Sequence, residues 1–304
     1  MDFMDEKDHT LALLEEKSRS RRSAIMLGGA ALAGLAMSRR NAFAQSSTTV
    51  TDNDILNFAL NLEFLEGQFY TLATTGMTLD QAGISTRSGS GTAGGSVTVK
   101  TNPAVPFQDP LLKQLAMEIA SDEQNHVKFL QSALGSNAVG QPNIDLMNSF
   151  NTLAQAAGLG ASFDPFASEA NFLLGAFVFE DVGVTAYQGA AGLISSKTVL
   201  DKAVGIHNVE AYHAAAIRTR IFQAGSAAQA ASQAIAATRA KLDGTGNDDI
   251  GVGVSSGAAT IVDNDANGMT YARTTSQVLS IVYGGGAAGT GGVFFPNALN
   301  GTIR

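Results

Sequence analysis

Apolar residues recur every three or four positions along four long stretches of the chain, which is the pattern of helices that bury one face. These stretches cover residues 55–70, 112–133, 173–187 and 199–217. Four amphipathic helices of this length can enclose a common core. The pattern therefore predicts an all-α fold, with a four-helix bundle built from residues 45–242.

Capping residues predict where these helices begin. Asp109-Pro110 and Asp164-Pro165 each place a carboxylate before a proline, which suits the N-cap and the first position of a helix. They are expected to open the second and third bundle helices. The first helix is expected to begin at Thr51 or Asp52, and the fourth is expected to be capped by Ser195 or Ser196.

Segments rich in glycine, serine and threonine separate the first two helices. Residues 76–107 predict a long loop that contains a strand at residues 96–99. A short connecting helix is expected within residues 142–158. Long loops of this kind are often functional.

The C-terminal part of the chain changes in composition. The alanine-rich residues 226–241 predict an extra surface helix that Asp243-Gly244 ends. From Asp243 onward, 13 of 62 residues are glycine, too many for a continuous helix. Residues 243–304 are therefore expected to wrap the bundle as an irregular extension, with short strands and one or two helical turns near residues 275–283.

Six ionisable residues lie inside the apolar stripes, where a core side chain is expected. Residues three apart on a helix share a face, so a Glu-x-x-His pair can direct a carboxylate and an imidazole at one point. Along the chain the order is Glu, Glu-x-x-His, Glu, Glu-x-x-His, the ligand order of a two-metal carboxylate site in a four-helix bundle. The six predicted metal ligands are Glu63, Glu123, His126, Glu180, Glu210 and His213.

Buried glutamate and histidine can also form a hydrogen-bonded network without metal. The charges favour a metal site over a metal-free network. Four carboxylates that face one another in a core repel, and two divalent cations would neutralise them. Carboxylate and imidazole together suit iron or manganese, and iron is preferred here. The ligand types do not separate iron from manganese or zinc.

With these motifs, residues 52–225 resemble the ferritin-like superfamily, which includes bacterioferritin, rubrerythrin and manganese catalase. The helix pair looks duplicated, because Tyr70 follows Glu63 by seven residues and Tyr187 follows Glu180 by the same spacing. The resemblance implies that Glu63 with His126 holds one metal and Glu180 with His213 the other. It also implies that Glu123 and Glu210 bridge both ions.

The chain differs from several well-known members of the superfamily, and these differences indicate which members it resembles most. Gln124 stands where bacterioferritin has its haem-ligating methionine, and the chain has no cysteine for a rubrerythrin-type iron module. The long loop and the tail disfavour a storage cage. Residues 57–66 and 277–284 are most similar to the exported ferritin-like proteins grouped with plant and bacterial desiccation-related proteins.

Three further residues are catalytic candidates. Tyr70 and Tyr187 lie two helical turns from Glu63 and Glu180 on the same faces, where they can bond a ligand carboxylate, relay electrons or only pack the core. Glu66 follows Glu63 by three residues, so either one can be the ligand of the first helix. In the duplicated half, the counterpart of Glu66 is Gly183.

Two other polar features have weaker interpretations. His207 precedes Glu210 by three residues and belongs either to the surroundings of the metal site or to the surface. Residues 263–268, Asp-Asn-Asp-Ala-Asn-Gly, resemble the start of a calcium loop. Position twelve is Thr274 instead of glutamate, so an Asx-rich hairpin turn is the favoured interpretation.

The N-terminus predicts export. Arg21-Arg22 precedes the uncharged residues 24–37, and Ala42-Phe43-Ala44 provides a cleavage site, which together are typical of a twin-arginine signal peptide over residues 1–44. A membrane anchor would need about 20 apolar residues, so no stable membrane span is expected after cleavage. The protein is then expected in the periplasm or outside the cell, carried folded by the twin-arginine machinery with its metals already bound.

Charge excludes one class of partner. The chain has a net charge of −8, and residues 1–44 hold seven basic and six acidic residues, so the processed chain carries −9. Such acidity argues against nucleic acid. The absence of cysteine permits an oxidising compartment without requiring one.

These features predict an exported di-metal, preferably di-iron, carboxylate protein that handles iron, dioxygen or peroxide. As an enzyme it would be an oxidoreductase of ferroxidase, peroxidase or catalase type, with a small oxidant as its partner. The alternative is a stress- or desiccation-protective or binding protein whose metal only stabilises the bundle. Oligomeric state, electron donor and turnover stay open.

Overall fold

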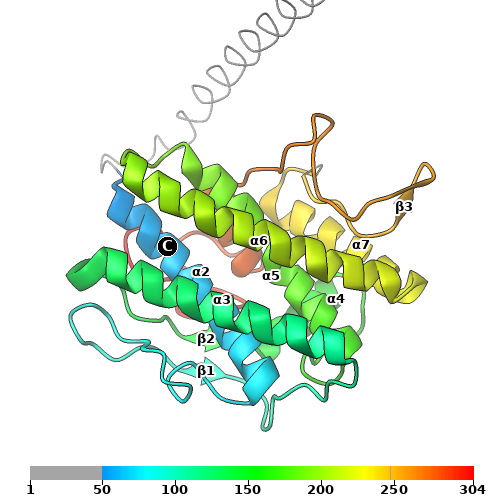
Figure 1. The fold of residues 1–304 in the computed structure, drawn as a ribbon, viewed down its shortest axis with the longest axis horizontal. Coiled ribbons are helices and arrows are strands. Elements are labelled where there is room, and N and C mark those ends of the chain that lie inside the picture. The colour runs from blue at the N-terminus through cyan, green and yellow to red at the C-terminus, as the bar shows by residue number, and fades with distance from the viewer. Residues whose placement is uncertain (1–49, 247) are drawn as a thin grey trace, which may run out of the picture. The chain divides into compact units, whose positions relative to one another are not determined.

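Seven α-helices make up most of the chain that the computed structural model describes, residues 50–246 and 248–304 (Figure 1). This confirms the all-α fold. The expected signal peptide, residues 1–44, lies outside the described residues. None of the helices in the described part is both long enough and apolar enough to cross a membrane.

The bundle consists of two helical hairpins. In the first, α2 packs chiefly against α3, and in the second, α5 packs chiefly against α6, while α2 and α5 also contact each other. This order follows the four amphipathic stretches. The bounds are α2 Asp52–Thr75, α3 Pro110–Leu134, α5 Glu169–Ala191 and α6 Lys197–Gln223, with α4 Asn148–Ala156, α7 Ser226–Asp243 and α8 Thr275–Val282 outside the bundle.

Most of the predicted helix ends are confirmed. Thr51 caps α2 in a capping box with Asp54, and Asp109 caps α3 ahead of Pro110. Of the two serines considered for α6, Ser196 is the cap. Gly244 ends α7 in the left-handed region, with φ 78°, which glycine adopts at little cost.

The prediction for the third bundle helix was wrong by one turn. Ser168, and not Asp164, caps α5 by accepting a hydrogen bond from the backbone N–H of Asn171. The carboxylate of Asp164 accepts instead from the backbone N–H of Phe166 at 2.9 Å and pairs with Lys100. These contacts hold Asp164-Pro165 in a turn that precedes the helix.

Short strands occur in the loop and in the tail. The predicted strand near residues 96–99 is β1, Val97–Thr98, which pairs in parallel with β2, Ile144–Asp145. In the tail, β3, Val254–Ser255, and β4, Ala258–Ala259, form an antiparallel hairpin. A single 3₁₀ turn, Gly135–Asn137, follows α3.

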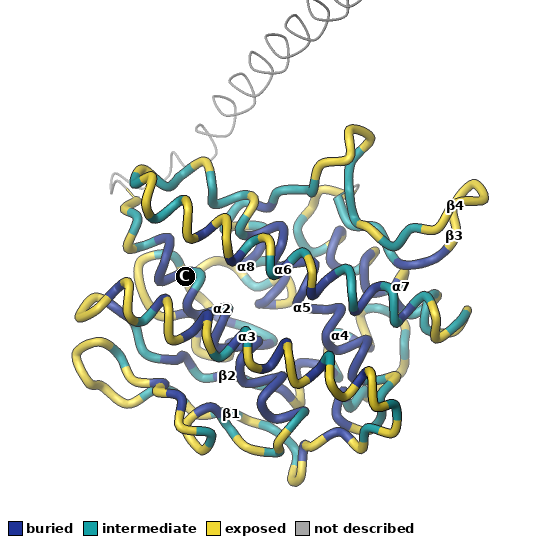
Figure 2. The backbone as a smooth tube through the Cα atoms, in the orientation of Figure 1, coloured by how far each residue is buried: buried dark blue, intermediate teal, exposed yellow. Residues whose placement is uncertain are grey.

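Part of the C-terminal tail, residues 243–304, is buried in the protein core. Helices α2 and α5 are buried on nearly all sides (Figure 2), because α3 and α6 cover one side and the tail covers another. Phe294 is fully buried and packs edge-on against Phe150 and Phe179. Near the C-terminus, the backbone of Asn300 exchanges two hydrogen bonds with the Asn61 side chain of α2.

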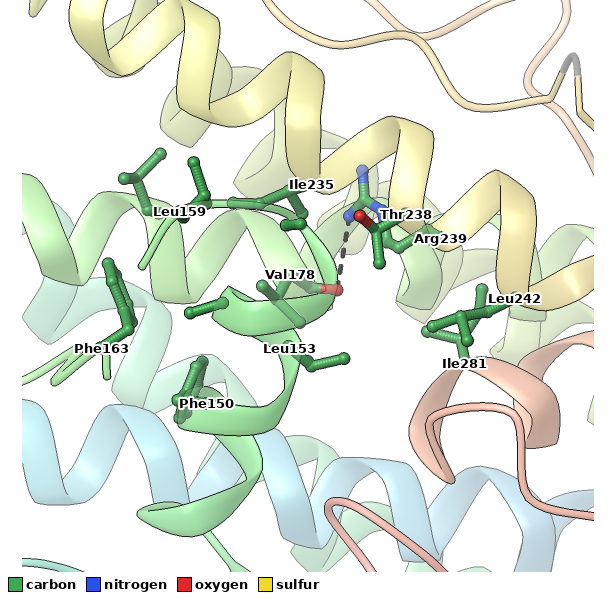
Figure 3. Close-up of a pocket in the computed structure, with 13 residues that line it drawn as sticks. Phe150, Leu153, Leu159, Phe163, Val178, Ile235, Thr238, Arg239, Leu242 and Ile281 are labelled. Atoms are coloured by element: carbon green, nitrogen blue, oxygen red, sulfur yellow. Dashed lines mark hydrogen bonds between the residues drawn. The ribbon is translucent and has the colours of Figure 1, made fainter. Parts of the chain in front are cut away.

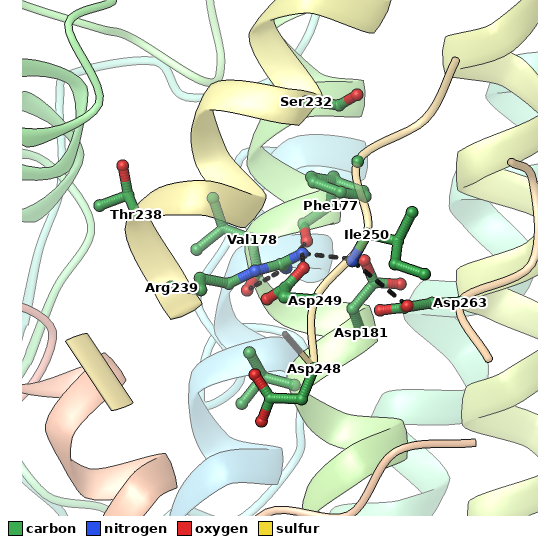
Figure 4. Close-up of polar contacts among 12 residues, drawn as sticks. Phe177, Val178, Asp181, Ser232, Thr238, Arg239, Asp248, Asp249, Ile250 and Asp263 are labelled. Carbon is green, nitrogen blue, oxygen red and sulfur yellow. Dashed lines mark hydrogen bonds and ion pairs between the residues drawn. The ribbon is translucent and has the colours of Figure 1, made fainter. Parts of the chain in front are cut away.

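A buried ion network, which sequence analysis missed, joins the tail to the helices (Figure 4). Arg239 of α7 pairs with Asp181 of α5 at 2.9 Å and with Asp249 of the tail at 2.7 Å. Arg218 of α6 pairs with the same oxygen of Asp181. Because removing one partner of a buried pair leaves an uncompensated charge, this network should fix the position of the tail.

The acidic segment at residues 263–268 forms an Asx turn, which is the interpretation favoured over a calcium loop. The Asp265 carboxylate accepts hydrogen bonds from the backbone N–H groups of Asn267 and Met269. Asp263 lies in the network instead, where its Oδ1 accepts from the N–H of Ile250 (Figure 4) and its Oδ2 is buried without a partner in the described chain.

The stability of the protein should depend on Asp263 between about pH 4 and pH 7. Burial raises the pKa of Asp263 from 3.8 to about 7, the carboxylates of Asp181 and Asp249 add to the rise, and Arg218 and Arg239 oppose it. The folded state then binds this proton more tightly than the unfolded chain does. The free energy of unfolding should therefore fall as the pH rises through this window.

Urea denaturation at a series of pH values would test this dependence. Asp263→Asn should flatten the slope between about pH 4 and pH 7 relative to the wild-type protein. Equal slopes in the two proteins would show that Asp263 is not the titrating group.

Candidate metal centre

The six predicted ligands meet at one place inside the bundle. The six residues form two groups in which one ligand atom from each residue lies within 4.8 Å of the others, and Glu123 belongs to both groups. Each of the four bundle helices contributes to the site. The first group is Glu63, Glu123, His126 and Glu210, and the second is Glu123, Glu180 and His213.

Each histidine faces a different lone glutamate. The Nδ1 atom of His126 lies 3.3 Å from a Glu63 oxygen, and the Nδ1 atom of His213 lies 3.6 Å from a Glu180 oxygen. Glu123 approaches both imidazoles, at 3.4 Å from His126 and 3.0 Å from His213. Glu210 lies 3.5 Å from the Nδ1 atom of His126. The implied roles of these residues, including the bridging by Glu123 and Glu210, stay predictions.

The atoms of these side chains that lack a hydrogen-bond partner could hold metal ions. Eight buried side-chain atoms of the six residues have no hydrogen-bond partner among the described residues. They comprise both oxygens of Glu123 and of Glu210, one oxygen of Glu63 and of Glu180, and the Nδ1 atom of each histidine. Buried polar atoms are rarely left unpaired, and a bridging carboxylate needs two free oxygens where a terminal one needs one.

The two tyrosines bond the lone glutamates crosswise. The Tyr70 hydroxyl of α2 donates to Glu180 of α5, and the Tyr187 hydroxyl of α5 donates to Glu63 of α2. Burial, followed by the nearby carboxylates, raises the pKa of both hydroxyls. They therefore stay protonated as donors, and each leaves its glutamate one oxygen for a metal.

In the metal-free protein, some of the candidate ligands have raised pKa values and hold protons. Burial alone lowers the pKa of His213, but the carboxylates of Glu180 and Glu123 outweigh it and raise the pKa to about 10. Burial also raises the pKa of Glu63 to about 8, against the attraction of His126. Ligands must lose these protons when a metal binds, so loading should release protons.

Asp122 is a part of the site that sequence analysis missed. Its carboxylate lies 3.2 Å from the Nε2 atom of His213, on the opposite side of the ring from the Nδ1 atom that faces the ligands. A carboxylate at this place orients a ligating imidazole and makes it more basic. The corresponding residue before Glu210 is Val209, a difference between the two repeats that could have drawn attention to Asp122.

Glu66 and Gly183 make the site asymmetric. Glu66 is buried, and the carboxylates of Glu210 and Glu123 add to burial in raising its pKa. A Cβ atom on Gly183 would lie 2.3 Å from Glu210 Oε2 and 3.4 Å from Glu66 Oε1. The missing side chain therefore leaves space for the Glu210 carboxylate.

His207 lies outside both ligand groups. It is half-buried, and burial lowers its pKa. Within the described chain, its Nε2 atom is buried and unpaired.

Comparison with known proteins identifies a family and two relatives. A family model described as a ferritin-like domain matches residues 51–223, which span α2 to α6 and hold all six predicted ligands. The desiccation-related protein PCC13-62 of Craterostigma plantagineum is 27% identical over 270 residues, 83% of each chain. The ferritin-like catalase Nec2 of Nesocodon mauritianus is 24% identical over 269 residues, 83% of this chain and 84% of that protein. No solved structure matches the chain significantly.

Proposed function

Because the chain belongs to the ferritin-like domain family, we propose that it holds two metal ions, preferably iron, and reacts with dioxygen or peroxide. The observation that carries this proposal is the set of eight buried ligand atoms without a hydrogen-bond partner in the part of the chain that the structure describes, two each on Glu123 and Glu210 and one on each of the other four residues. A di-iron or di-manganese centre would supply redox chemistry that the chain's own side chains lack. The name of the relative from Nesocodon mauritianus, a ferritin-like catalase, supports peroxide as the oxidant.

The protein's own residues would prepare the site for that chemistry. Tyr187 and Tyr70 hold Glu63 and Glu180 in place with one hydrogen bond each. Asp122 holds the His213 ring. Full burial of Glu123 and Glu210 keeps bulk water from the shared carboxylates.

Metal analysis followed by a turnover assay would test the proposal. Protein purified from cells with ample iron and manganese should contain about two transition-metal ions per chain. It should also oxidise iron(II) or decompose peroxide. A metal content below about a tenth of an equivalent would overturn the two-metal site.

A second candidate function is protective or structural, which the desiccation-related relative favours. In that case the metals would raise thermal stability, but the loaded protein would turn over neither iron(II) nor peroxide. Turnover thus separates the two functions even when the metal content is the same.

Glu66 should affect the reaction with peroxide more than metal binding. It lies beside the space at Gly183 that adjoins Glu210, so it can hold or transfer a proton next to a shared ligand. Glu66→Ala should keep both metals and slow peroxide-driven oxidation of the reduced site more than dioxygen-driven oxidation, as followed by stopped-flow absorbance. Equal slowing would make Glu66 a structural residue, and loss of one metal would make it a ligand in place of Glu63.

We also propose export through the twin-arginine machinery to the periplasm or beyond. Replacing Arg21 and Arg22 together by lysine should retain the precursor in the cytoplasm, because that machinery reads the arginine pair. Cell fractionation measures the result. Undiminished export of the double variant would indicate the general secretion route and remove the reason to expect metal loading before export.

A further inference from the structure

A cavity of about 220 Å³ opens at the end of the bundle where α3 ends and α6 begins. Four other cavities hold about 20 to 50 Å³ each. Among them is the apolar cavity between α4, α5, α7 and α8 (Figure 3). The cavity at the bundle end is thus several times larger, and neither the ligand groups nor the ion network accounts for it.

The walls of this cavity are almost entirely apolar. The buried side chains of Leu56, Leu130 and Ile206 form its inner part. Phe129, Thr198 and Lys202 are exposed and lie at its mouth. No carboxylate lines it, and the ammonium group of Lys202 pairs outside with Asp201. A metal cation would find no ligands here, and an anion would lose its hydration without a buried partner.

Its volume suits one aromatic ring. An apolar cavity of about 150 Å³ is large enough to bind benzene, so 220 Å³ admits a ring with a small substituent. The rings of Phe129 and Tyr187 are both in the wall. They offer the edge and face contacts that aromatic ligands prefer.

The inner wall of the cavity adjoins the metal centre. Tyr187 lines the cavity, and its hydroxyl donates to Glu63 at 2.5 Å. Leu130 and Ile206 lie four residues from His126 and Glu210, which is about 6 Å along each helix. A molecule in the cavity would therefore lie one helical turn from the ligands.

We infer that this cavity binds a small uncharged aromatic compound, about the size of phenol, against the ring of Tyr187. Binding itself needs no metal. Coupling between the bound compound and the metal centre rests on the proposed function, because it passes through the hydrogen bond from Tyr187 to Glu63. By linkage, metal loading should then change the affinity for the compound.

Fluorine NMR with 4-fluorophenol as the probe would test binding to the metal-free full-length protein. The probe should bind saturably, and 4-fluorobenzoate, which is charged, should bind at least about tenfold more weakly. Ala203→Leu, which fills the cavity from a buried position in α6, and Ala133→Leu, which fills it from the exposed mouth, should each weaken binding by about tenfold. If Ala203→Leu does not fold, Ala133→Leu decides alone.

The matched control is Ala237→Leu, at an exposed alanine of α7 that lines none of the cavities compared. It should leave binding of 4-fluorophenol unchanged.

Three results would each overturn the inference. They are no saturable binding, binding that neither cavity variant affects, and tighter binding of 4-fluorobenzoate than of 4-fluorophenol. Binding that is unchanged by metal loading would leave the site in place but contradict its coupling to the centre.

Discussion

Glu123→Ala should remove both metal ions from the protein. The carboxylate of Glu123 lies 3.4 Å from His126 and 3.0 Å from His213, so it is the one side chain that belongs to both ligand groups. Mutating a residue that only orients a metal ligand weakens metal binding by up to about 100-fold. Losing the ligand itself should therefore weaken binding by at least about 100-fold. His126→Ala, which touches one group, should lose about one ion per chain.

Two measurements would check this result. Elemental analysis counts the ions, and thermal unfolding with and without added metal reports binding to the folded state. Metal should raise the melting temperature of the wild-type protein and leave that of Glu123→Ala nearly unchanged. Glu118→Ala, at an exposed glutamate of the same helix, is the control and should behave as wild type. Two ions retained by Glu123→Ala would show that Glu123 does not bridge.

Gly183→Ala should weaken metal binding without weakening the helix. A Cβ atom at this position would lie 2.3 Å from Glu210 Oε2, so the Glu210 carboxylate has to move. Under the proposed function Glu210 is a metal ligand, so displacing its carboxylate should lower the affinity for metal by about 10- to 100-fold. In the metal-free protein, alanine should stabilise the interior of α5 by up to about 1 kcal/mol relative to glycine, less the cost of moving Glu210.

The chain offers a matched control in Gly205 of α6. A Cβ atom there meets nothing within 4 Å. Gly205→Ala should therefore stabilise α6 by a similar free energy and leave metal binding unchanged. Metal titration and urea denaturation of the two metal-free variants would measure both effects. If Gly183→Ala binds two ions as tightly as wild type, the space beside Glu210 is not needed by the site.

Local patterns in the chain were enough to predict the bundle and the six candidate ligands of its site. Helical periodicity depends only on neighbouring residues, so the apolar stripes predicted four helices, and the Glu-x-x-His spacing placed Glu123 with His126 on one face. Caps that act within one turn, such as Thr51 and Asp109, were predicted for the same reason. The prediction of Asp164 as a cap was wrong, because its carboxylate forms a turn with Phe166 and pairs with Lys100 of a distant loop.

Contacts between segments far apart in the chain had to come from the tertiary structure. The sequence alone determined an all-α chain with six ligand candidates inside apolar stripes. Only the folded chain decided that Tyr70 bonds Glu180 across the bundle, that Asp122 supports His213, and that Gly183 leaves room for Glu210. It also decided that the glycine-rich tail enters the core at Phe294 and that Arg239 joins the tail to α5. Periodicity reports which face of a helix is buried, whereas the partner of a buried polar atom depends on how the helices are placed in space.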